Sequence, residues 1–325
     1  MNPSEAILAV TYRCNSRCTH CDIWQKKLDG QEAAPSFYYR LPRSLRLVNL
    51  TGGEPFLRDD LVEAAMVVTE RCGRPALHLS TNGIATDRIL AAVKEIRRIN
   101  PRTGVRISID GAQQTHDRIR GVPGAFEKAM ATLEGLKASG LRDLGIAFTL
   151  SRGNEHELMK IHRLARSLRV DFSTAVVHSS AFFFGEKQEM VPEVLAARSA
   201  LGELERAQLR GLRPKQWLRA FFTHGQIAHL AGDPVPVACG ALREFIFVDP
   251  FGTVYPCNVL DVPVGNLSDG TLEELIVRNP AAMEAVKQCR KNCWMVCTAR
   301  PMMRRAPWRP LGWIAARKLI PGVRR

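Results

Sequence analysis

The chain has 325 residues, of which 46% are hydrophobic, and its formal net charge is +14. An apolar fraction of this size is typical of a globular protein with a sizeable core. The sequence contains no run of about 20 apolar residues, which excludes a bilayer-spanning helix, and its first residues do not resemble a signal peptide. We therefore expect a cytoplasmic protein, in which the nine cysteines act as ligands or free thiols rather than disulfides.

The first 180 residues alternate short apolar segments with amphipathic ones. The apolar segments predict strands at 7–12, 45–50, 76–80, 105–110, 144–150 and 171–178. The segments between them predict helices at 59–71, 87–99, 125–139 and 155–168. This order is typical of an α/β protein with a parallel sheet, either a partial barrel or an open doubly wound sheet, in which ligands gather at the C-terminal ends of the strands.

The alternation stops near residue 180. Residues 181–235 contain three consecutive phenylalanines and a predicted helix at 192–208. We expect them to form a connector or a substrate lid, and ordinary core packing by the phenylalanines is the alternative. Residues 236–300 predict a small second domain, with a hairpin over 245–257, its turn at 249–252, and a helix over 272–287.

Three cysteines follow the first predicted strand with the spacing C-x3-C-x2-C: Cys14, Cys18 and Cys21. Three thiolates leave one iron of a four-iron cluster without a protein ligand. A zinc site needs four ligands, and no further Cys or His lies at zinc-finger spacing, although His20 stands between two of the cysteines. On this motif alone, three structural thiols also remain an open interpretation.

Polar residues also end the next three predicted strands. The second strand ends at Gly52, Gly53 and Glu54, where two glycines permit a close backbone approach and the carboxylate can accept a hydrogen bond from an ammonium group. The third ends at Ser80-Thr81-Asn82 and the fourth at Ser108-Ile109-Asp110, with Arg120 further along the chain. A guanidinium can bind a carboxylate through two hydrogen bonds, but an ion pair of Arg120 with Asp110 at the rim is the alternative.

Together these motifs resemble those of radical S-adenosylmethionine (SAM) enzymes. The resemblance implies a partial (β/α)6 TIM-like barrel in which Cys14, Cys18 and Cys21 hold a 4Fe–4S cluster, and the methionine end of SAM chelates the open iron. It also implies which residues contact SAM: His20 beside the adenine, Gly52, Gly53 and Glu54 at the amino group, Ser80 and Asn82 near the ribose, and Ser108 and Arg120 as further contacts.

A second set of cysteines lies in the C-terminal third: Cys239, Cys257, Cys289, Cys293 and Cys297. The set resembles the auxiliary-cluster domains of the same superfamily, called SPASM in the long form and twitch in the short form. Five cysteines are too few for two clusters, so we expect one auxiliary 4Fe–4S cluster. The expected ligands are the first four cysteines, with Cys297 as the extra or replacement, and zinc at this site is the alternative.

The positive charge is concentrated in a basic tail at 301–325. Residues 298–325 contain seven Arg, one Lys and no acidic residue, a charge of +8, which leaves only +6 for the other 297 residues. Such a segment with two tryptophans could lie on an anionic membrane surface, at the inner face of the membrane, or bind an acidic partner or nucleic acid. The alternative is a segment that wraps the barrel and exposes its arginines.

The resemblance implies that a donor such as flavodoxin or ferredoxin delivers an electron, that SAM is cleaved to a 5′-deoxyadenosyl radical, and that this radical takes a hydrogen atom from a substrate. We expect oxidation or epimerisation of a small or lipid-linked, sugar-like metabolite, because the chain begins almost at the first strand and leaves no room for a peptide-recognition domain. One alternative is a maturase of a ribosomal peptide or protein. The other is a non-enzymatic iron–sulfur or zinc protein that binds nucleic acid. If the chain is an enzyme, we expect no nucleic-acid partner.

Overall fold

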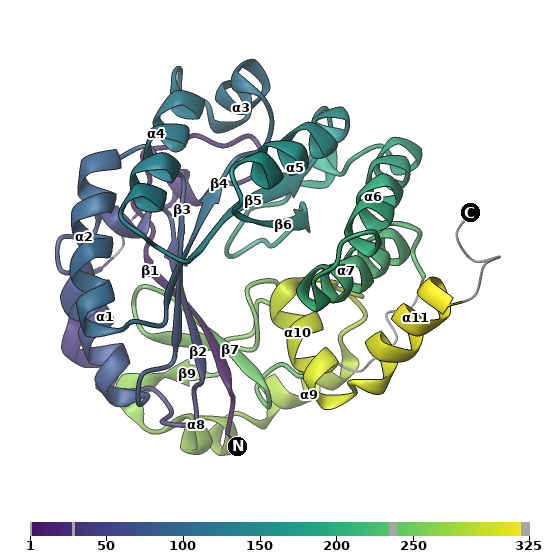
Figure 1. Ribbon diagram of the computed structural model, residues 1–325. Coiled ribbons are helices and arrows are strands. Elements are labelled where there is room, and N and C mark those ends of the chain that lie inside the picture. The colour runs from purple at the N-terminus through teal and green to yellow at the C-terminus, as the bar shows by residue number, and fades with distance from the viewer. Residues whose placement is uncertain (1, 28–29, 234–238, 320–325) are drawn as a thin grey trace.

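The computed structural model describes residues 2–27, 30–233 and 239–319. Within these residues nine strands form one open sheet in the order β6-β5-β4-β3-β2-β1-β7-β8-β9 (Figure 1). The strands are β1 Glu5–Thr11, β2 Leu47–Gly52, β3 Ala76–Thr81, β4 Thr103–Ser108, β5 Asp143–Leu150, β6 Asp171–Val176, β7 Phe245–Val248, β8 Thr253–Tyr255 and β9 Gly265–Asn266. The first six are parallel, so the prediction of a partial barrel is confirmed.

Helices cover the outer face of this curved sheet. They are α1 Leu61–Arg71, α2 Thr86–Ile99, α3 Gln113–Arg120, α4 Ala125–Ala138 and α5 Leu158–Ser167. Four of them were predicted within a few residues of their bounds, whereas α3 was not. The sequence of α3 contains a single apolar residue, Ile119, and therefore has no hydrophobic periodicity that predicts a helix.

The two faces of the barrel strands differ in a way that matters for the site. Along β3, Leu77 and Leu79 are fully buried under the outer helices, while His78 and Ser80 point inward and are partly exposed. The strand neighbours follow the same alternation, since successive side chains point to opposite faces of a sheet. The hydrophobic core therefore lies between the sheet and its outer helices, and solvent reaches the polar interior of the barrel.

The C-terminal segment continues the same sheet. Strand β7 pairs in parallel with β1, with Glu5 opposite Phe245, and β7 and β8 form the predicted hairpin. The single helix predicted at 272–287 is wrong. Two helices occur instead, α8 Leu272–Arg278 and α9 Pro280–Gln288, because Pro280 has no N–H to donate to the preceding turn and begins a new helix.

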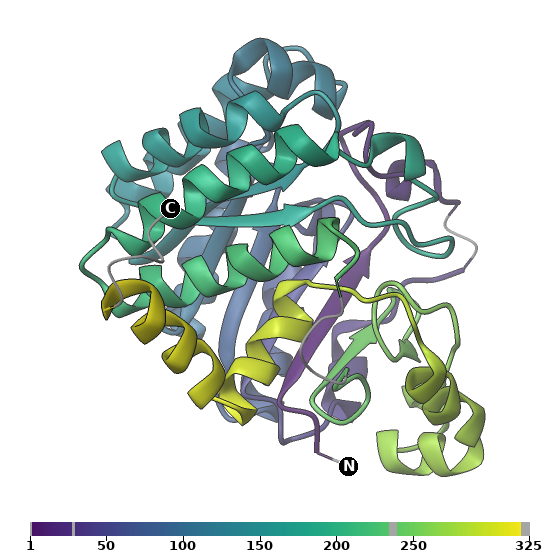
Figure 2. The same cartoon turned by 90° about the vertical axis from the view of Figure 1, so that its right-hand side faces the viewer.

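Four further helices stand on the open side of the sheet: α6 Val194–Leu209, α7 Pro214–Leu230, α10 Val296–Arg305 and α11 Trp308–Leu319. Figure 2 shows α6 and α7 lying side by side and α10 next to the strand pair β1–β7. Helix α6 was predicted and α7 was not. The first part of the basic tail wraps the body, because Arg300 and Arg304 of α10 both pair with Glu5 and Trp313 of α11 packs on Phe221.

Among the described residues, no helix is both long enough and apolar enough to cross a membrane.

Candidate active site

The loop that carries Cys14, Cys18 and Cys21 follows β1 and is fixed by backbone contacts with α3. The N–H of Arg17 donates to the carbonyl of Arg120 at 2.8 Å, and that of Thr19 donates to Ile119 at 2.9 Å. Gly121 ends α3 with a φ of 63°, and a Cβ there would lie 2.6 Å from the Arg17 carbonyl oxygen. Helix α3, absent from the sequence prediction, therefore holds the central loop in place.

The second predicted motif, at the end of β2, lies directly against the same loop. The N–H groups of Gly53 and Glu54 donate to the carbonyls of Thr11 and Arg13, each at 2.8 Å. A Cβ on either Gly52 or Gly53 would lie 2.2 Å from one of these carbonyl oxygens. The two glycines therefore let the end of β2 approach the backbone of residues 11–13, where the cysteine loop begins.

Glu54 is fully buried and ties the ends of β2 and β3 together. Its carboxylate accepts hydrogen bonds from the Thr81 hydroxyl at 2.8 Å, the Asn82 backbone N–H at 2.7 Å and the Phe56 N–H at 3.3 Å. Burial raises the pKa of Glu54 to about 7, and these donors oppose that shift. The side chain of Asn82 reaches into the cysteine loop and donates to Asn15 at 2.7 Å and to Ser16 at 3.0 Å.

Arg120 lies beneath the loop and contacts a cysteine directly. Its guanidinium is 3.6 Å from the Cys18 sulfur and 2.5 Å from the Asp110 carboxylate, which is fully buried. The pair is therefore a buried one and not the rim ion pair considered from the sequence. Burial lowers the pKa of His20 to about 4, and its buried Nδ1 has no partner among the described residues.

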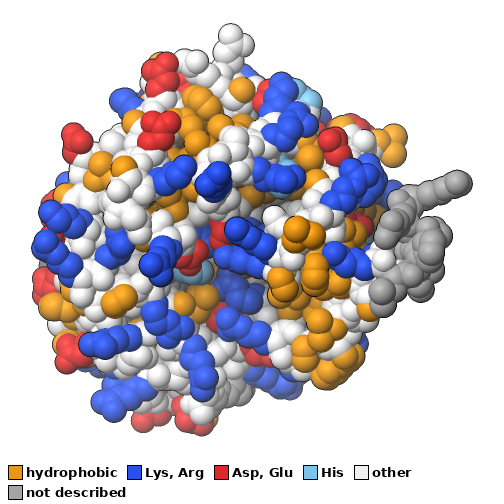
Figure 3. Space-filling model, viewed as in Figure 1, with side chains coloured by type: hydrophobic (Ala, Val, Ile, Leu, Met, Phe, Trp, Pro, Cys, Tyr) orange, Lys and Arg blue, Asp and Glu red, His pale blue; other side chains and the backbone are white. Residues whose placement is uncertain are grey.

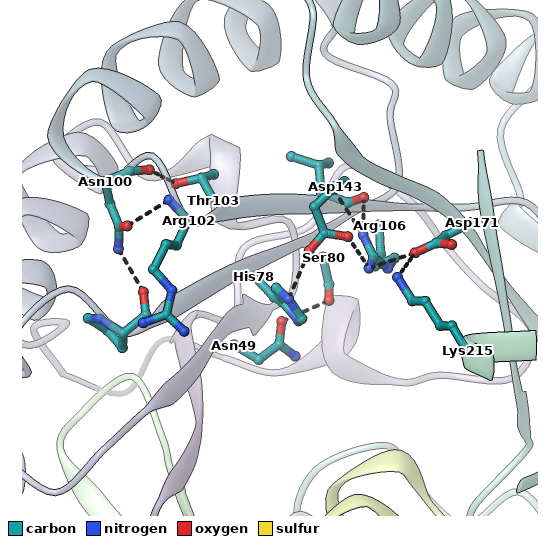
Figure 4. Close-up of polar contacts among 12 residues, drawn as sticks. Asn49, His78, Ser80, Asn100, Arg102, Thr103, Arg106, Asp143, Asp171 and Lys215 are labelled. Carbon is teal, nitrogen blue, oxygen red and sulfur yellow. Dashed lines mark hydrogen bonds and ion pairs between the residues drawn. The ribbon is translucent and has the colours of Figure 1, made fainter. Parts of the chain in front are cut away.

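Two of the predicted contact residues lie on the inner wall of the barrel. The Ser80 hydroxyl donates to the Asn49 side chain at 3.1 Å, inside the barrel (Figure 4). Ser108 is the last residue of β4 and is partly exposed on the same inner face. The structure thus brings Gly52, Gly53, Glu54, Asn82 and Arg120 to the cysteine loop, while Ser80 is hydrogen-bonded within the inner wall.

The five C-terminal cysteines also converge. Repulsion from Cys239 and Cys289 contributes to raising the pKa of both Cys257 and Cys293, although burial is the main cause. Cys257 accepts hydrogen bonds from the N–H groups of Val259 and Leu260, at 3.4 and 3.3 Å. Burial raises the pKa of Cys297, repulsion from Cys257 adds to this shift, and Arg300 opposes it.

Comparison with known proteins adds to this geometry. Residues 8–165 match the model of the radical SAM superfamily, and residues 239–299 match that of SPASM, an iron–sulfur cluster-binding domain. The chain belongs to the radical SAM superfamily. It carries the SPASM domain at its C-terminal end, where the second set of cysteines lies.

Named relatives of this radical SAM chain are synthases and maturases. It is 27% identical over 299 residues to the AdoMet-dependent heme synthase of Methanosarcina barkeri, covering 82% of this chain and 80% of that one. It is 28% identical over 264 residues to the mycofactocin maturase MftC of Mycolicibacterium smegmatis, covering 76% and 62%. It is 30% identical to the Fe-coproporphyrin III synthase of Methanosarcina barkeri over 167 residues, 50% of this chain, and spans only 40% of that protein's length.

The fold agrees with a solved structure of the superfamily. The structure of anSMEcpe with bound AdoMet and the Cp18Cys peptide superposes with a TM-score of 0.66 at 17% identity, covering 96% of this chain and 99% of that one. At this identity the likeness concerns the fold alone.

Membership of the radical SAM superfamily implies a 4Fe–4S cluster and SAM, and the donors at the cysteine loop suit them. Burial raises the pKa of Cys14 to about 11 and that of Cys21 to about 12, so iron would have to displace their protons. The backbone N–H groups of Ser16 and Ile23 point at these two sulfurs, and Arg120 points at the third. Such donors stabilise the negative charge of cluster thiolates.

Across the described ranges, no three Cys, His, Asp or Glu side chains are arranged to hold a single metal ion.

Several supporting residues were missed by sequence reasoning. Lys187 donates to Asp22 at 2.7 Å, and the N–H of Asp22 donates to the carbonyl of Phe184 at 2.8 Å. The segment with three phenylalanines is therefore anchored to the cysteine loop, where Phe183 is buried against Tyr12 and Phe247. The three consecutive phenylalanines are a visible signal in the sequence, but their distant partners Tyr12 and Phe247 are not.

Proposed function

We propose that this chain is a radical SAM enzyme that removes a hydrogen atom from a substrate held inside the barrel. The observation that carries the proposal is the loop of three thiols at the C-terminal ends of the strands, directly above a polar and solvent-accessible barrel interior. When bound at Cys14, Cys18 and Cys21, a 4Fe–4S cluster and SAM supply a 5′-deoxyadenosyl radical after one-electron reduction. We also propose that an electron donor such as flavodoxin or ferredoxin delivers this electron.

The chain's own residues position the cofactor in this scheme. Arg120 places a positive charge at the Cys18 sulfur, and Asp110 fixes the direction of its guanidinium. Glu54 holds the ends of β2 and β3 against the loop, so the ligand-binding backbone is rigid before SAM arrives. Phe183, packed on Tyr12, closes one side of the loop to water, which limits the competing hydrogen donors near a radical.

For the substrate, we propose a small or lipid-linked metabolite that is oxidised or epimerised. The polar inner wall, with Asn49, His78 and Ser80 partly exposed, can donate and accept hydrogen bonds as such a molecule requires. A maturase that modifies a ribosomal peptide or protein is the second candidate, and the similarity to mycofactocin maturase MftC favours it. Membership of an enzyme superfamily leaves the non-enzymatic, nucleic-acid-binding alternative without support.

The experiment is anaerobic reconstitution of the full chain with iron and sulfide, followed by SAM and dithionite, with 5′-deoxyadenosine measured by chromatography. The wild-type chain is expected to form this product, and Cys18→Ala is expected to form none. Cys72→Ala is the matched control, because Cys72 is a buried cysteine that caps α1, belongs to the hydrophobic core and donates its thiol to the Pro42 carbonyl, at 3.8 Å. Equal product from the wild-type chain and Cys18→Ala would overturn the proposal.

A further inference from the structure

The lower half of the barrel interior contains a cluster of charged side chains that the proposed chemistry does not use. Arg106 of β4 lies between two carboxylates, 2.6 Å from Asp143 of β5 and 3.6 Å from Asp171 of β6 (Figure 4). His78 of β3 completes the row, with its Nε2 3.3 Å from Asp143. Four neighbouring strands thus place ionisable groups on one inner wall, below Ser80.

Helix α7 adds two more cations from the open side of the sheet. Lys215 pairs with Asp171, and Arg219 lies 3.2 Å from the same carboxylate. A single carboxylate, Asp171, therefore faces three cationic side chains. One nitrogen of Arg219, Nη1, is buried and has no hydrogen-bond partner within the described part of the chain.

Helix α10 likewise places more than one cation at a single carboxylate, near the start of β1. Arg300 and Arg304 pair with one carboxylate, that of Glu5, at 3.0 and 2.9 Å. Arg300 is close enough to Arg219 that burial, together with repulsion from Arg106 and Arg300, lowers the pKa of Arg219 despite the opposing effect of Asp171. Counted over both groups, five Lys and Arg side chains face three carboxylates.

Two glycines of the wall let these aspartates pack directly against the neighbouring strands, and solvent still reaches the cations beside them. Gly104 and Gly145 are the inward neighbours of the two aspartates, and a Cβ on them would lie 2.5 Å from an Asp143 oxygen and 2.8 Å from the Asp171 Cβ. The side chains of Arg106 and Arg219 are inside the barrel and yet 15% and 21% exposed. In the space-filling view, Lys and Arg side chains gather around a hollow at the centre of this face (Figure 3).

We propose that the substrate carries an anionic group, a carboxylate or a phosphate, which binds at Arg219 and the neighbouring Arg106, Lys215 and Arg300. This inference rests on the proposed function, because it names the class of substrate that the radical would meet. Guanidinium groups bind both anions through charge-assisted hydrogen bonds. With the anion at the base of the barrel, the rest of the molecule extends past Ser80 and Ser108 toward the cysteine loop.

The test measures anion binding without turnover. The reconstituted, SAM-loaded chain is titrated with glutarate, with inorganic phosphate and with uncharged glutaramide, and binding is followed by calorimetry and by thermal shift. SAM is present so that its own carboxylate already occupies the site at the cysteine loop. Glutarate or phosphate is expected to bind and glutaramide is not, and the anion that binds identifies the group.

Three variants make the test specific. Arg219→Gln is expected to weaken anion binding about tenfold, the usual cost of one charge-assisted hydrogen bond. Asp171→Asn is expected to strengthen it, because the competing carboxylate is removed while the side-chain shape remains. Arg88→Gln is the control, since Arg88 pairs with Asp59 on the outer surface, and it is expected to bind as the wild-type chain does.

The outcomes separate the inference from the proposed function. Equal anion affinity in the wild-type chain, Arg219→Gln and Asp171→Asn would overturn the inference, as would equal binding of glutaramide. Cleavage of SAM by the wild-type chain without any anion tests the proposed function on its own. Anion binding with no cleavage would therefore reject the proposed function alone, and cleavage with no anion binding would reject the inference alone.

Discussion

His162 of α5 is a buried imidazole in a cationic neighbourhood. It packs edge-on against Phe172 with ring centroids 5.3 Å apart, and its Nδ1 has no partner within the described residues. Burial lowers its pKa to about 4, and Arg166, Arg163 and Arg219 act in the same direction. The folded state therefore disfavours the protonated form of this residue.

This shift predicts a pH dependence of stability. Because the folded pKa lies below the ordinary 6.5, His162 contributes nothing to the pH dependence well above pH 6.5, and it destabilises the fold as the pH falls from 6.5 toward 4. A shift of this size corresponds to a loss of up to about 3 kcal/mol. His162→Gln is expected to flatten that part of the curve, measured as the free energy of unfolding in urea at each pH.

The control for this measurement is His156→Gln. The side chain of His156 is 65% exposed just before α5, so this variant shows what the replacement of an exposed histidine alone does to the curve. A His162→Gln curve that parallels the wild-type curve would contradict the prediction.

At the scale of elements, Trp294 packs the segment between Cys293 and Cys297 against α7. Trp294 is buried between Phe221 and Phe222, and its indole N–H donates to the Phe222 carbonyl at 2.7 Å. The indole lies directly over Gly225, where an added Cβ would be 2.0 Å from it. A glycine in the middle of a helix costs about 1 kcal/mol relative to alanine, so its presence here is explained by the ring that covers it.

Gly225→Ala is accordingly expected to destabilise the chain by about 1–3 kcal/mol net, because the indole must move. Gly202→Ala in α6 is the matched control, since a Cβ there meets only the flexible end of Arg206 at 3.5 Å. It is expected to be neutral or to stabilise the chain by up to about 1 kcal/mol. Denaturant unfolding of both variants checks the prediction, and equal midpoints for the two would contradict it.

At the scale of the whole molecule, one sheet carries two sets of cysteines, one in the loop after β1 and one in the segments that flank β7 and β8. We expect about eight irons per chain, two four-iron clusters, after reconstitution. Cys18→Ala and Cys257→Ala are each expected to retain about four, with different electron paramagnetic resonance signals, because each removes a ligand of a different set. Four irons in the wild-type chain, or loss of all iron in either variant, would contradict the arrangement.

Much of this fold was predictable because its signals are local. The six barrel strands are short apolar runs, and the motifs at their ends are contiguous, so the cysteine loop, Gly52–Glu54 and Arg120 could be named from the sequence. What could not be predicted depends on distant pairs. The depth of the Arg120–Asp110 pair, the contact of Lys187 with Asp22 and the interior position of Ser80 all follow from how strands and loops meet in space. The break at Pro280 is itself a local signal, because proline lacks the N–H that would continue the preceding helix.

The pairing of β1 with β7 also bears on how the chain is made. Residues 5–8 pair with residues 245–248. One edge of β1 therefore remains unpaired until the ribosome has synthesised about three quarters of the chain. An unpaired apolar edge can pair with other chains during that interval. Contacts between such distant segments also slow folding. Low yields of soluble protein are therefore expected for fragments that end before β7, even when they contain every residue of the SAM-binding half.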